Sequence, residues 1–364
     1  MAGSSFGNIF RVTTWGESHG AGIGAVVDGC PAGLPLCEAD VQQYLNRRKP
    51  GQSRFSTPRK EDDQVEILSG LFEGRTTGTP ISMIVHNKTQ RSGDYSEIAS
   101  YYRPGHADYT YDCKYGFRDY RGGGRSSGRE TIGRVAAGAV AAKMLGELGI
   151  TLTTYTKAIG PVAARRFDAE EIFRNPLYMP DREAAKQAQD YLNQCMKEMD
   201  SGGGVIECVV EHLPAGLGDP VFEKLSANLA KAVCSVGAVK GFEIGDGFAA
   251  AGARGSENND PFRTDGNGRI CKASNHAGGV LGGISDGSPL VFRTAVKPTP
   301  SIFSPQQTVN TSGGDITCRI KGRHDPVIVP RAVVVVESMA ALVIADALLG
   351  GMTATMNHVK KIWG

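Results

Sequence analysis

Residues 118–134 read RDYRGGGRSSGRETIGR, a glycine- and arginine-rich loop that runs directly into the alanine-rich segment ETIGRVAAGAVAAKMLGELG at residues 130–149. The second segment contains no proline and ends in glycine, which predicts a buried helix. Glycine tolerates positive φ, so the loop can point backbone N–H groups at one centre, and a helix N-terminus favours an anion there. The stretch therefore predicts a polyanion-binding loop at the start of a core helix.

The side chains of this loop supply further donors. Arginines lie at positions 118, 121, 125, 129 and 134, and hydroxyl groups lie at 126, 127 and 131. An arginine-rich surface turn and an RGG-like RNA contact are the two other interpretations. We favour the anion site because the donors adjoin a helix start and are not spread along a low-complexity tail.

The composition disfavours several classes of protein. A chain of 364 residues with 40% hydrophobic content can bury a large core, and its 48 glycines predict many tight turns. The formal net charge is only +2, which disfavours nucleic-acid binding because that depends on broad positive charge. The clustered arginines are therefore local features of a balanced surface.

The cysteines and the apolar residues predict a cytoplasmic protein. The eight cysteines have no CxxC pair and lie at positions 30, 37, 113, 195, 208, 234, 271 and 318. Their spacing disfavours a zinc site, a thioredoxin-type centre or a disulfide framework. No apolar run approaches the roughly 20 residues that a membrane span requires, and the N-terminus lacks the core of a signal peptide. We expect no metal site and no membrane contact.

Local patterns predict a series of strands and helices. Residues 6–15 and 23–28 alternate and predict adjacent strands joined by GESHGAG. Gly20, Gly22 and Ala25 match a dinucleotide-binding fingerprint, but strand and turn residues follow them where a helix is required, so we discount that site. Further helices are predicted at residues 38–49, 181–199 and 221–236, and further strands at 64–68, 81–87 and 205–211. The basic end of the 38–49 helix either complements the helix dipole or contacts a second anion.

The second half of the chain repeats the first. VVDGCPAGL at 26–34 matches VVEHLPAGL at 209–217, and SGLFEGRTTGTPI at 69–81 resembles GGVLGGISDGSPL at 278–290. The order is preserved, so we expect two related halves packed around a pseudo-twofold axis with a site between them. The second copy is longer, and the polar segment 252–275 best accounts for the insertion and is a candidate lid.

Three titratable groups lie in turns marked by glycine or proline: His19 in GESHG, His106 in RPGHADY and Asp325 in GRHDP. A histidine with a pKa near ~6.5 can give or take a proton at neutral pH. Taken singly, each group is better explained by a structural hydrogen bond, but Arg103 and Arg323 give His106 and Asp325 a nearby cation that could hold an anionic substrate. The absence of HExxH, Gly-Lys-Ser/Thr and GxSxG motifs removes the usual signatures of zinc proteases, Walker-type enzymes and α/β-hydrolases. The residues indicate an enzyme that binds a small polyanion and moves protons with histidine.

The motifs GESHG, RPGHADYTY, YRGGGRSSGRET and GRHDP closely resemble those of the chorismate synthase family, in the right order over nearly the whole chain. One departure is Gly128, where many members carry alanine. The resemblance implies an α+β fold, a β-α-β sandwich with helices between antiparallel sheets. We expect one domain over residues 1–364 with two pseudo-symmetric halves, roughly 1–200 and 201–364, and a homotetramer.

The resemblance also implies the reaction, namely anti-1,4-elimination of phosphate and a ring proton from 5-enolpyruvylshikimate 3-phosphate to give chorismate. Reduced FMN is required without net redox change. Some family members reduce their flavin with NADPH (NADP-linked activity), but the compact length here favours an external reductant. The rival interpretations are a flavin-independent lyase or transferase acting on another phosphorylated metabolite, and an RNA-binding module.

Site residues follow from the same resemblance. His19 would protonate the departing phosphate, His106 would stabilise or protonate the reduced flavin, and Asp325 would assist removal of the ring proton. The implied substrate contacts are Arg48, Arg54, Arg129, Arg323, Ser18 and Ser127. The implied FMN contacts are Arg125, Ser126, Ser127, Gly237, Ala238, Gly282, Lys297, Pro298, Thr299, Pro300, Ser301 and Arg323. The substrate and FMN are both anionic, so several guanidinium groups are needed to offset their repulsion.

Overall fold

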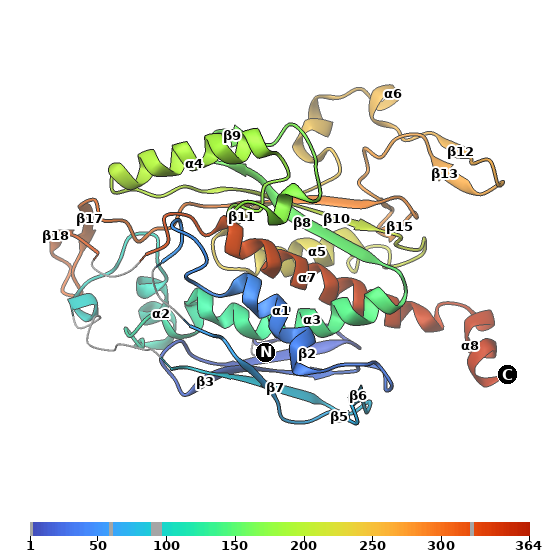
Figure 1. The fold of residues 1–364 in the computed structure, drawn as a ribbon, viewed down its shortest axis with the longest axis horizontal. Coiled ribbons are helices and arrows are strands. Elements are labelled where there is room, and N and C mark those ends of the chain that lie inside the picture. The colour runs from blue at the N-terminus through green and yellow to red at the C-terminus, as the bar shows by residue number, and fades with distance from the viewer. Residues whose placement is uncertain (1–2, 58–60, 89–96, 321–323) are drawn as a thin grey trace.

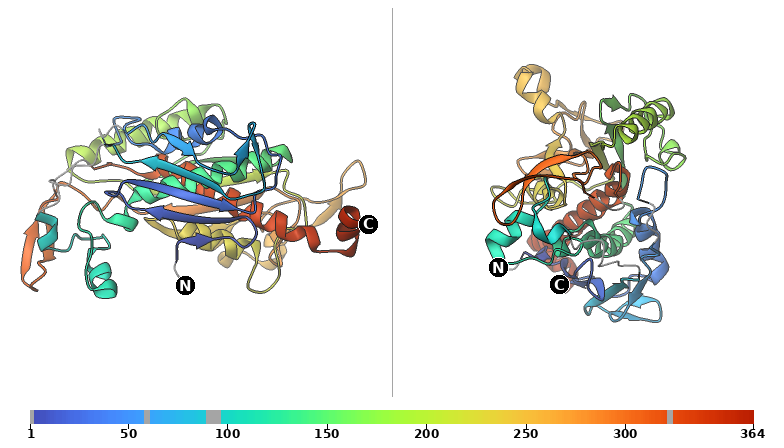
Figure 2. Two further views of the ribbon diagram at one scale, coloured as in Figure 1. Left: turned by 90° about the horizontal axis from the view of Figure 1, so that it is seen from below. Right: turned by 90° about the vertical axis from the view of Figure 1, so that its left-hand side faces the viewer.

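The computed structural model describes residues 3–57, 61–88, 97–320 and 324–364. Two five-stranded antiparallel sheets enclose a layer of helices, and a further helix lies on the outer face of the second sheet (Figure 1). The right-hand view of Figure 2 shows the same layers from the side. This α+β sandwich is the predicted fold.

The first sheet has the order β1-β2-β3-β7-β4. Its strands are β1 (Ser5–Phe6), β2 (Arg11–Gly16), β3 (Gly22–Asp28), β4 (Val65–Ile67) and β7 (Ile81–His86). The predicted pairing of the first two long strands is confirmed, with Thr14 opposite Ala25. Gly22 and Ala25 lie within β3, so no helix follows the glycines and the dinucleotide fingerprint is a coincidence.

The second sheet has the order β11-β16-β10-β8-β9. Its strands are β8 (Thr151–Ile159), β9 (Val162–Ala163), β10 (Gly204–Glu211), β11 (Val239–Ile244) and β16 (Leu290–Val296). The strand order β2-β3-β7-β4 of the first sheet corresponds to β8-β10-β16-β11 of the second. Each sheet is followed along the chain by a long core helix, so the sequence repeat has a structural counterpart. The strand β8 lies before residue 200, the expected boundary between the halves, but it belongs to the second sheet.

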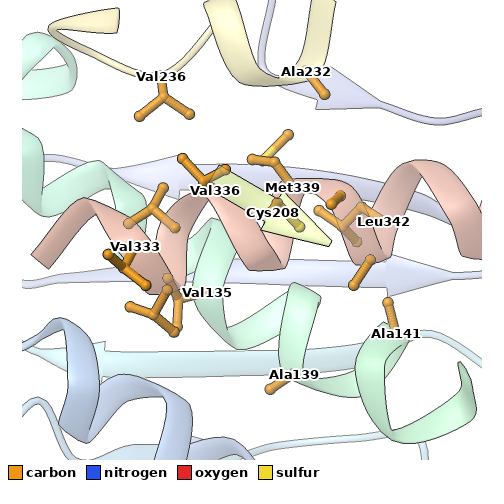
Figure 3. Close-up of a cluster of buried hydrophobic side chains, with 14 of the residues drawn as sticks. Val135, Ala139, Ala141, Cys208, Ala232, Val236, Val333, Val336, Met339 and Leu342 are labelled. Carbon is orange, nitrogen blue, oxygen red and sulfur yellow. The ribbon is translucent and has the colours of Figure 1, made fainter. Parts of the chain in front are cut away.

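Four helices fill the space between the sheets: α1 (Glu38–Arg48), α3 (Thr131–Glu147), α5 (Leu225–Cys234) and α7 (Val329–Gly350). Side chains of α3 and α7 interdigitate at the centre, with Cys208 of β10 and Val236 beside α7 (Figure 3). The α7 segment corrects one prediction, because Val329–Thr353 is long and apolar enough to span a membrane. Its most apolar window is 72% buried, which is typical of a core helix.

Glycine lets α3 and α7 approach closely. A Cβ added at Gly138 would lie 2.6 Å from the Cα atom of Ser338 and 2.8 Å from its Oγ. We expect Gly138→Ala to lower the free energy of unfolding by about 1–3 kcal/mol, because the backbones must separate, even though alanine is the better helix former. Urea denaturation measures this. In the matched control Gly146→Ala the new Cβ meets nothing within 4 Å, so that variant is expected to be as stable as the wild type or more stable. Equal destabilisation of both variants would contradict the explanation.

The other elements are short, apart from α4 on the outer face. They are α2 (Asp108–Tyr115), α4 (Arg182–Lys197), α6 (Gly255–Asn258), α8 (Met356–Trp363), the 3-10 turns Glu97–Ser100, Gly124–Ser126, Gly128–Glu130, Glu171–Phe173, Gly247–Gly252 and Gly351–Thr353, and the hairpins β5 (Leu71–Phe72) with β6 (Arg75–Thr76), β12 (Phe262–Thr264) with β13 (Ile270–Lys272), β14 (Val280–Leu281) with β15 (Ile284–Ser285) and β17 (Gln306–Val309) with β18 (Asp315–Cys318). The helix predicted at 221–236 begins only at Leu225.

The insertion at 252–275 forms α6 and the β12–β13 hairpin, which project from the body. They lie at the opposite end of the molecule from α2 and the N-terminal end of α3 in both Figure 1 and the left view of Figure 2. Residues 252–275 therefore do not cover the arginine-rich loop of the same chain, and the expectation that they form a lid over it is wrong.

Candidate functional site

The arginine-rich loop is shaped by three consecutive glycines. Gly122, Gly123 and Gly124 have φ values of 68°, 83° and 52°, a run that residues with side chains rarely adopt. Two 3-10 turns follow and lead into α3, which confirms the predicted succession of loop and buried helix.

The loop packs on the turn between β2 and β3, which carries His19. The hydroxyl of Ser18 donates to the carbonyl oxygen of Gly122 at 3.2 Å, and a Cβ added at Gly122 would lie 2.5 Å from His19 Nε2. Arg125 donates to the carbonyl oxygens of Thr14 and Gly16, each at 3.2 Å. The Arg125 guanidinium thus anchors the end of β2, and the loop holds the buried His19 ring in place.

The other arginines of the loop separate into two groups. Arg118, Arg121 and Arg134 pair with the nearby carboxylates of Asp112, Asp119 and Glu130, respectively. Arg129 instead turns inward, is 6% exposed and pairs with Glu61 and Asp63. Fewer arginines of the loop are therefore available to bind an anion than the sequence predicted.

Arg48, at the end of α1, meets Arg129 at a shared carboxylate. Asp63 accepts from Arg48 Nη1 at 2.8 Å through Oδ2 and from Arg129 Nη1 at 3.3 Å through Oδ1. Arg48 is 2% exposed, and burial lowers the pKa of its guanidinium to about 10, a shift that Asp63 opposes. Two guanidinium groups from different elements are thus held side by side in the interior.

Asn87 joins this pair to the His19 turn. Its Oδ1 accepts from Arg129 Nε at 3.1 Å and from Nη2 at 2.7 Å. Its Nδ2 donates to the carbonyl oxygens of Glu17 and Gly20 at 3.0 and 2.9 Å. The backbone on both sides of His19 is therefore tied to the Arg129 guanidinium through one amide side chain.

Asp325 joins the same region from the start of α7. Its Oδ2 accepts from Arg331 Nη1 at 2.6 Å, and its Oδ1 accepts from the Thr57 N–H at 2.8 Å. Arg331 Nε also donates to the carbonyl oxygen of Arg48 at 3.1 Å. Arg54 remains exposed, with its guanidinium carbon 4.6 Å from the centroid of the Phe55 ring. Arg323 lies outside the described residues.

His106 contacts the KPTPS segment. Its Nε2 lies 2.8 Å from the hydroxyl oxygen of Ser301, and Lys297 Nζ donates to the carbonyl oxygen of Gly105 at 2.7 Å. Arg103 forms a two-pronged pair with Asp108, with both distances 2.8 Å. Burial, with a contribution from Arg103, lowers the pKa of His106 from 6.5 to about 4, so this ring is neutral at pH 7.

The remaining flavin-contact candidates do not all gather at that point. Ala238, with a φ of 72°, accepts through its carbonyl oxygen from Lys297 N at 2.9 Å, and Gly237 precedes it. The backbone carbonyl oxygen of Thr299 accepts from the hydroxyl of Ser201 at 2.7 Å. Gly282 lies in the β14–β15 turn, and Gly279, just before this hairpin, packs against Leu290 at the start of β16. Lys297 follows the last residue of β16, so Gly282 and Lys297 lie at opposite ends of this strand.

Sequence reasoning missed the residues that hold the arginines, namely Glu61, Asp63, Asn87 and Arg331. The acidic run EDD at 61–63 was the available signal for the first two, because carboxylates near a basic helix end suggest partners. Asn87 and Arg331 carry no local signal, since each acts across the fold.

The His106 environment predicts an acid-sensitive contribution to stability. The unfolded chain takes up this proton near pH 6.5, whereas the folded protein does so only near pH 4. The contribution is therefore complete above pH 6.5 and is lost as the pH falls towards 4, by at most about 3 kcal/mol. We expect urea denaturation between pH 7 and 4.5 to show a shallower pH dependence for His106→Gln than for the wild type. Identical slopes would show that His106 does not titrate in this way.

Comparisons with known proteins identify the family and support the fold. The family model described as chorismate synthase matches residues 10–349. Proteins named chorismate synthase from Agathobacter rectalis and Methanosarcina mazei are 69% and 56% identical, over 100% and 96% of this chain and 99% and 97% of their own lengths. A solved structure titled as a crystal structure of chorismate synthase has a TM-score of 0.77 at 31% identity, and covers 98% of this chain and 97% of its own.

The sandwich fold and the family match are those of an enzyme of the lyase class. The chain belongs to the chorismate synthase family, whose members act in the shikimate pathway.

Proposed function

We propose that this enzyme converts 5-enolpyruvylshikimate 3-phosphate to chorismate and phosphate by anti-1,4-elimination, with reduced FMN and no net redox change. One C–O bond and one C–H bond break, a new C=C bond forms, and phosphate and a proton leave. The observation that carries the proposal is the joining of Arg48 and Arg129, both buried, to the turn that bears His19.

The buried arginines suit a substrate with one phosphate and two carboxylates. Guanidinium groups bind such anions with paired, charge-assisted hydrogen bonds, each worth roughly 1.5–3 kcal/mol. Arg48 and Arg129 would hold the anionic groups together with Ser18, Ser127, Arg54 and Arg323. The buried setting strengthens these contacts, because little water competes for the donors.

His19 and Asp325 would handle the protons. His19 lies against Gly122 of the loop and would donate a proton to the departing phosphate. Asp325 is held by Arg331 and by the Thr57 N–H, so its position is set by two separate elements. It would assist removal of the ring proton.

The segment around His106 fits the ring and phosphate of FMN. It offers a cation, a hydroxyl and a neutral imidazole at Lys297, Ser301 and His106, and Ala238 adjoins Lys297. Arg125, Ser126 and Ser127 would add loop donors, with Gly237, Pro298, Thr299 and Pro300 as further contacts. Gly282 lies at the other end of β16 from Lys297, so we leave it out of this set. When bound, reduced FMN supplies the reduced ring that the elimination requires. The low pKa of His106 favours hydrogen-bond stabilisation over proton donation by this residue.

We propose in addition that the enzyme works in the cytoplasm as a homotetramer and depends on an external reductant for its reduced flavin. The supporting observations are the burial of its one long apolar helix among the described residues and the family membership.

An anaerobic assay tests the proposed reaction. Chemically reduced FMN and 5-enolpyruvylshikimate 3-phosphate are added to the purified protein, and chorismate absorbance is followed. We expect product only when the flavin is reduced. Product formed without flavin would support a flavin-independent lyase, and no product from an intact, folded protein would refute the assignment. Addition of NADPH with oxidised FMN tests whether the enzyme reduces its own flavin.

A further inference from the structure

The Asp63 carboxylate lies between two buried arginines, Arg48 and Arg129. Its two carboxylate oxygens are divided between them, with Oδ2 2.8 Å from Arg48 Nη1 and Oδ1 3.3 Å from Arg129 Nη1. The Asp63 side chain is 0% exposed. One carboxylate therefore sets the spacing between the guanidinium groups of α1 and of the 3-10 turn that precedes α3.

The backbone at Asp63 is held in a conformation that few residues adopt. Its φ is 46°, in the left-handed region, where aspartate and asparagine are the best tolerated residues after glycine. Gln42 of α1 supports this turn, because its Nε2 donates to the carbonyl oxygen of Asp63 at 3.3 Å and its Oε1 accepts from Val65 N at 3.0 Å. Such conformations persist where the surroundings enforce them, and they gather at binding sites.

The electrostatics of the pair require a counter-charge at this point. Arg129 and Arg331 both act on Arg48 as like charges, and Asp63 and Glu61 oppose them. Without a carboxylate between them, two adjacent buried guanidinium groups would repel each other and separate. Each guanidinium has five N–H donors. Asp63 engages only Nη1 of Arg48, so the other N–H groups of Arg48 can serve a ligand. Among the described residues Arg129 also bonds Glu61 and Asn87, which leaves one N–H on its Nη2 for the same ligand.

We propose that Asp63 is a positioning residue for anion binding: its carboxylate holds Arg48 and Arg129 at a fixed spacing, so that their other donors bind a phosphate or carboxylate group together. The inference rests on the proposed function for the identity of the substrate. Asp63 itself does not touch the substrate in this scheme.

Asp63→Asn tests the proposal, because asparagine keeps the shape and tolerates the backbone conformation but lacks the charge. We expect the affinity for 5-enolpyruvylshikimate 3-phosphate and for inorganic phosphate, measured by titration calorimetry, to fall on the order of 10–100-fold. Mutating residues that orient metal-binding side chains typically costs roughly 10–100-fold, and we expect the same range for this orienting carboxylate. In turnover assays KM should rise more than kcat falls. Gln42→Ala, which loosens the Asp63 turn and leaves both arginines intact, should show a smaller loss in the same direction.

Glu337→Gln is the matched control. Glu337 pairs with Arg47, the neighbour of Arg48 on α1, at 2.7 and 2.8 Å and is also buried. We expect this variant to lose thermal stability but to keep wild-type anion affinity. Unchanged or tighter binding by Asp63→Asn would overturn the proposal, as would an equal loss of affinity in Glu337→Gln. Failure of the wild type to form chorismate would count against the proposed function alone, since the phosphate titrations still decide the role of Asp63.

Discussion

His19→Ala is expected to lower turnover by roughly 10²–10⁴-fold while leaving the fold intact, the range typical of a lost general acid. His19 is only 9% exposed and its ring packs against Gly122, whose carbonyl accepts from Ser18, so the ring is confined to one place in the site. The loss should appear mainly in kcat, because the arginines that would bind the substrate remain. Steady-state chorismate formation under reduced FMN measures it.

A remote histidine provides the control for this variant. His358 lies exposed in α8, far along the chain from the arginine-rich loop, so His358→Ala should keep wild-type turnover. Circular dichroism and the thermal midpoint establish whether His19→Ala is folded. A folded His19→Ala variant with wild-type turnover would remove this residue from the mechanism.

Gly122→Ala is expected to reduce turnover by about 100-fold, although the substitution adds one methyl group to a residue that need not touch the substrate. The new Cβ would lie 2.5 Å from His19 Nε2 and 3.1 Å from Ser18 Oγ, and the φ of 68° is strained for alanine. The loop or the histidine must therefore move, and a displacement of about 1 Å at a reacting group can cost about 10²-fold in rate. Single-turnover kinetics would separate this loss from slower product release.

The same loop supplies a matched control for Gly122→Ala. At Gly128 an added Cβ meets nothing within 4 Å and the backbone is not in the left-handed region. We expect Gly128→Ala to be close to the wild type in both turnover and stability. If the two alanine variants are equally impaired, the loss reflects general sensitivity of the loop, and contact with His19 is not its cause.

Local sequence patterns were sufficient for much of the sandwich. The helices α1, α3 and α4 and the β2–β3 pairing were predicted because each depends on periodicity and on breakers within a short window. The helix α2 was missed, since its segment DYTYDCKY is rich in β-forming tyrosine and threonine and is stabilised by its surroundings. The polar insertion was located correctly, but its sequence carries no information about which end of the molecule it occupies.

The site divides in the same way. Sequence alone placed His19, His106 and Asp325 in glycine- or proline-marked turns, because such turns have local signatures. The tertiary structure decided which charged groups meet: Asp63 and Arg129 are 66 positions apart, and the Arg331 side chain bonds the backbone carbonyl of Arg48, 283 positions away. Pairings of this kind depend on how sheets and helices stack, since burial makes an unpaired charge costly and so selects partners by proximity in space. The sequence thus identified the chemical groups, whereas the packed fold determines which of them come together.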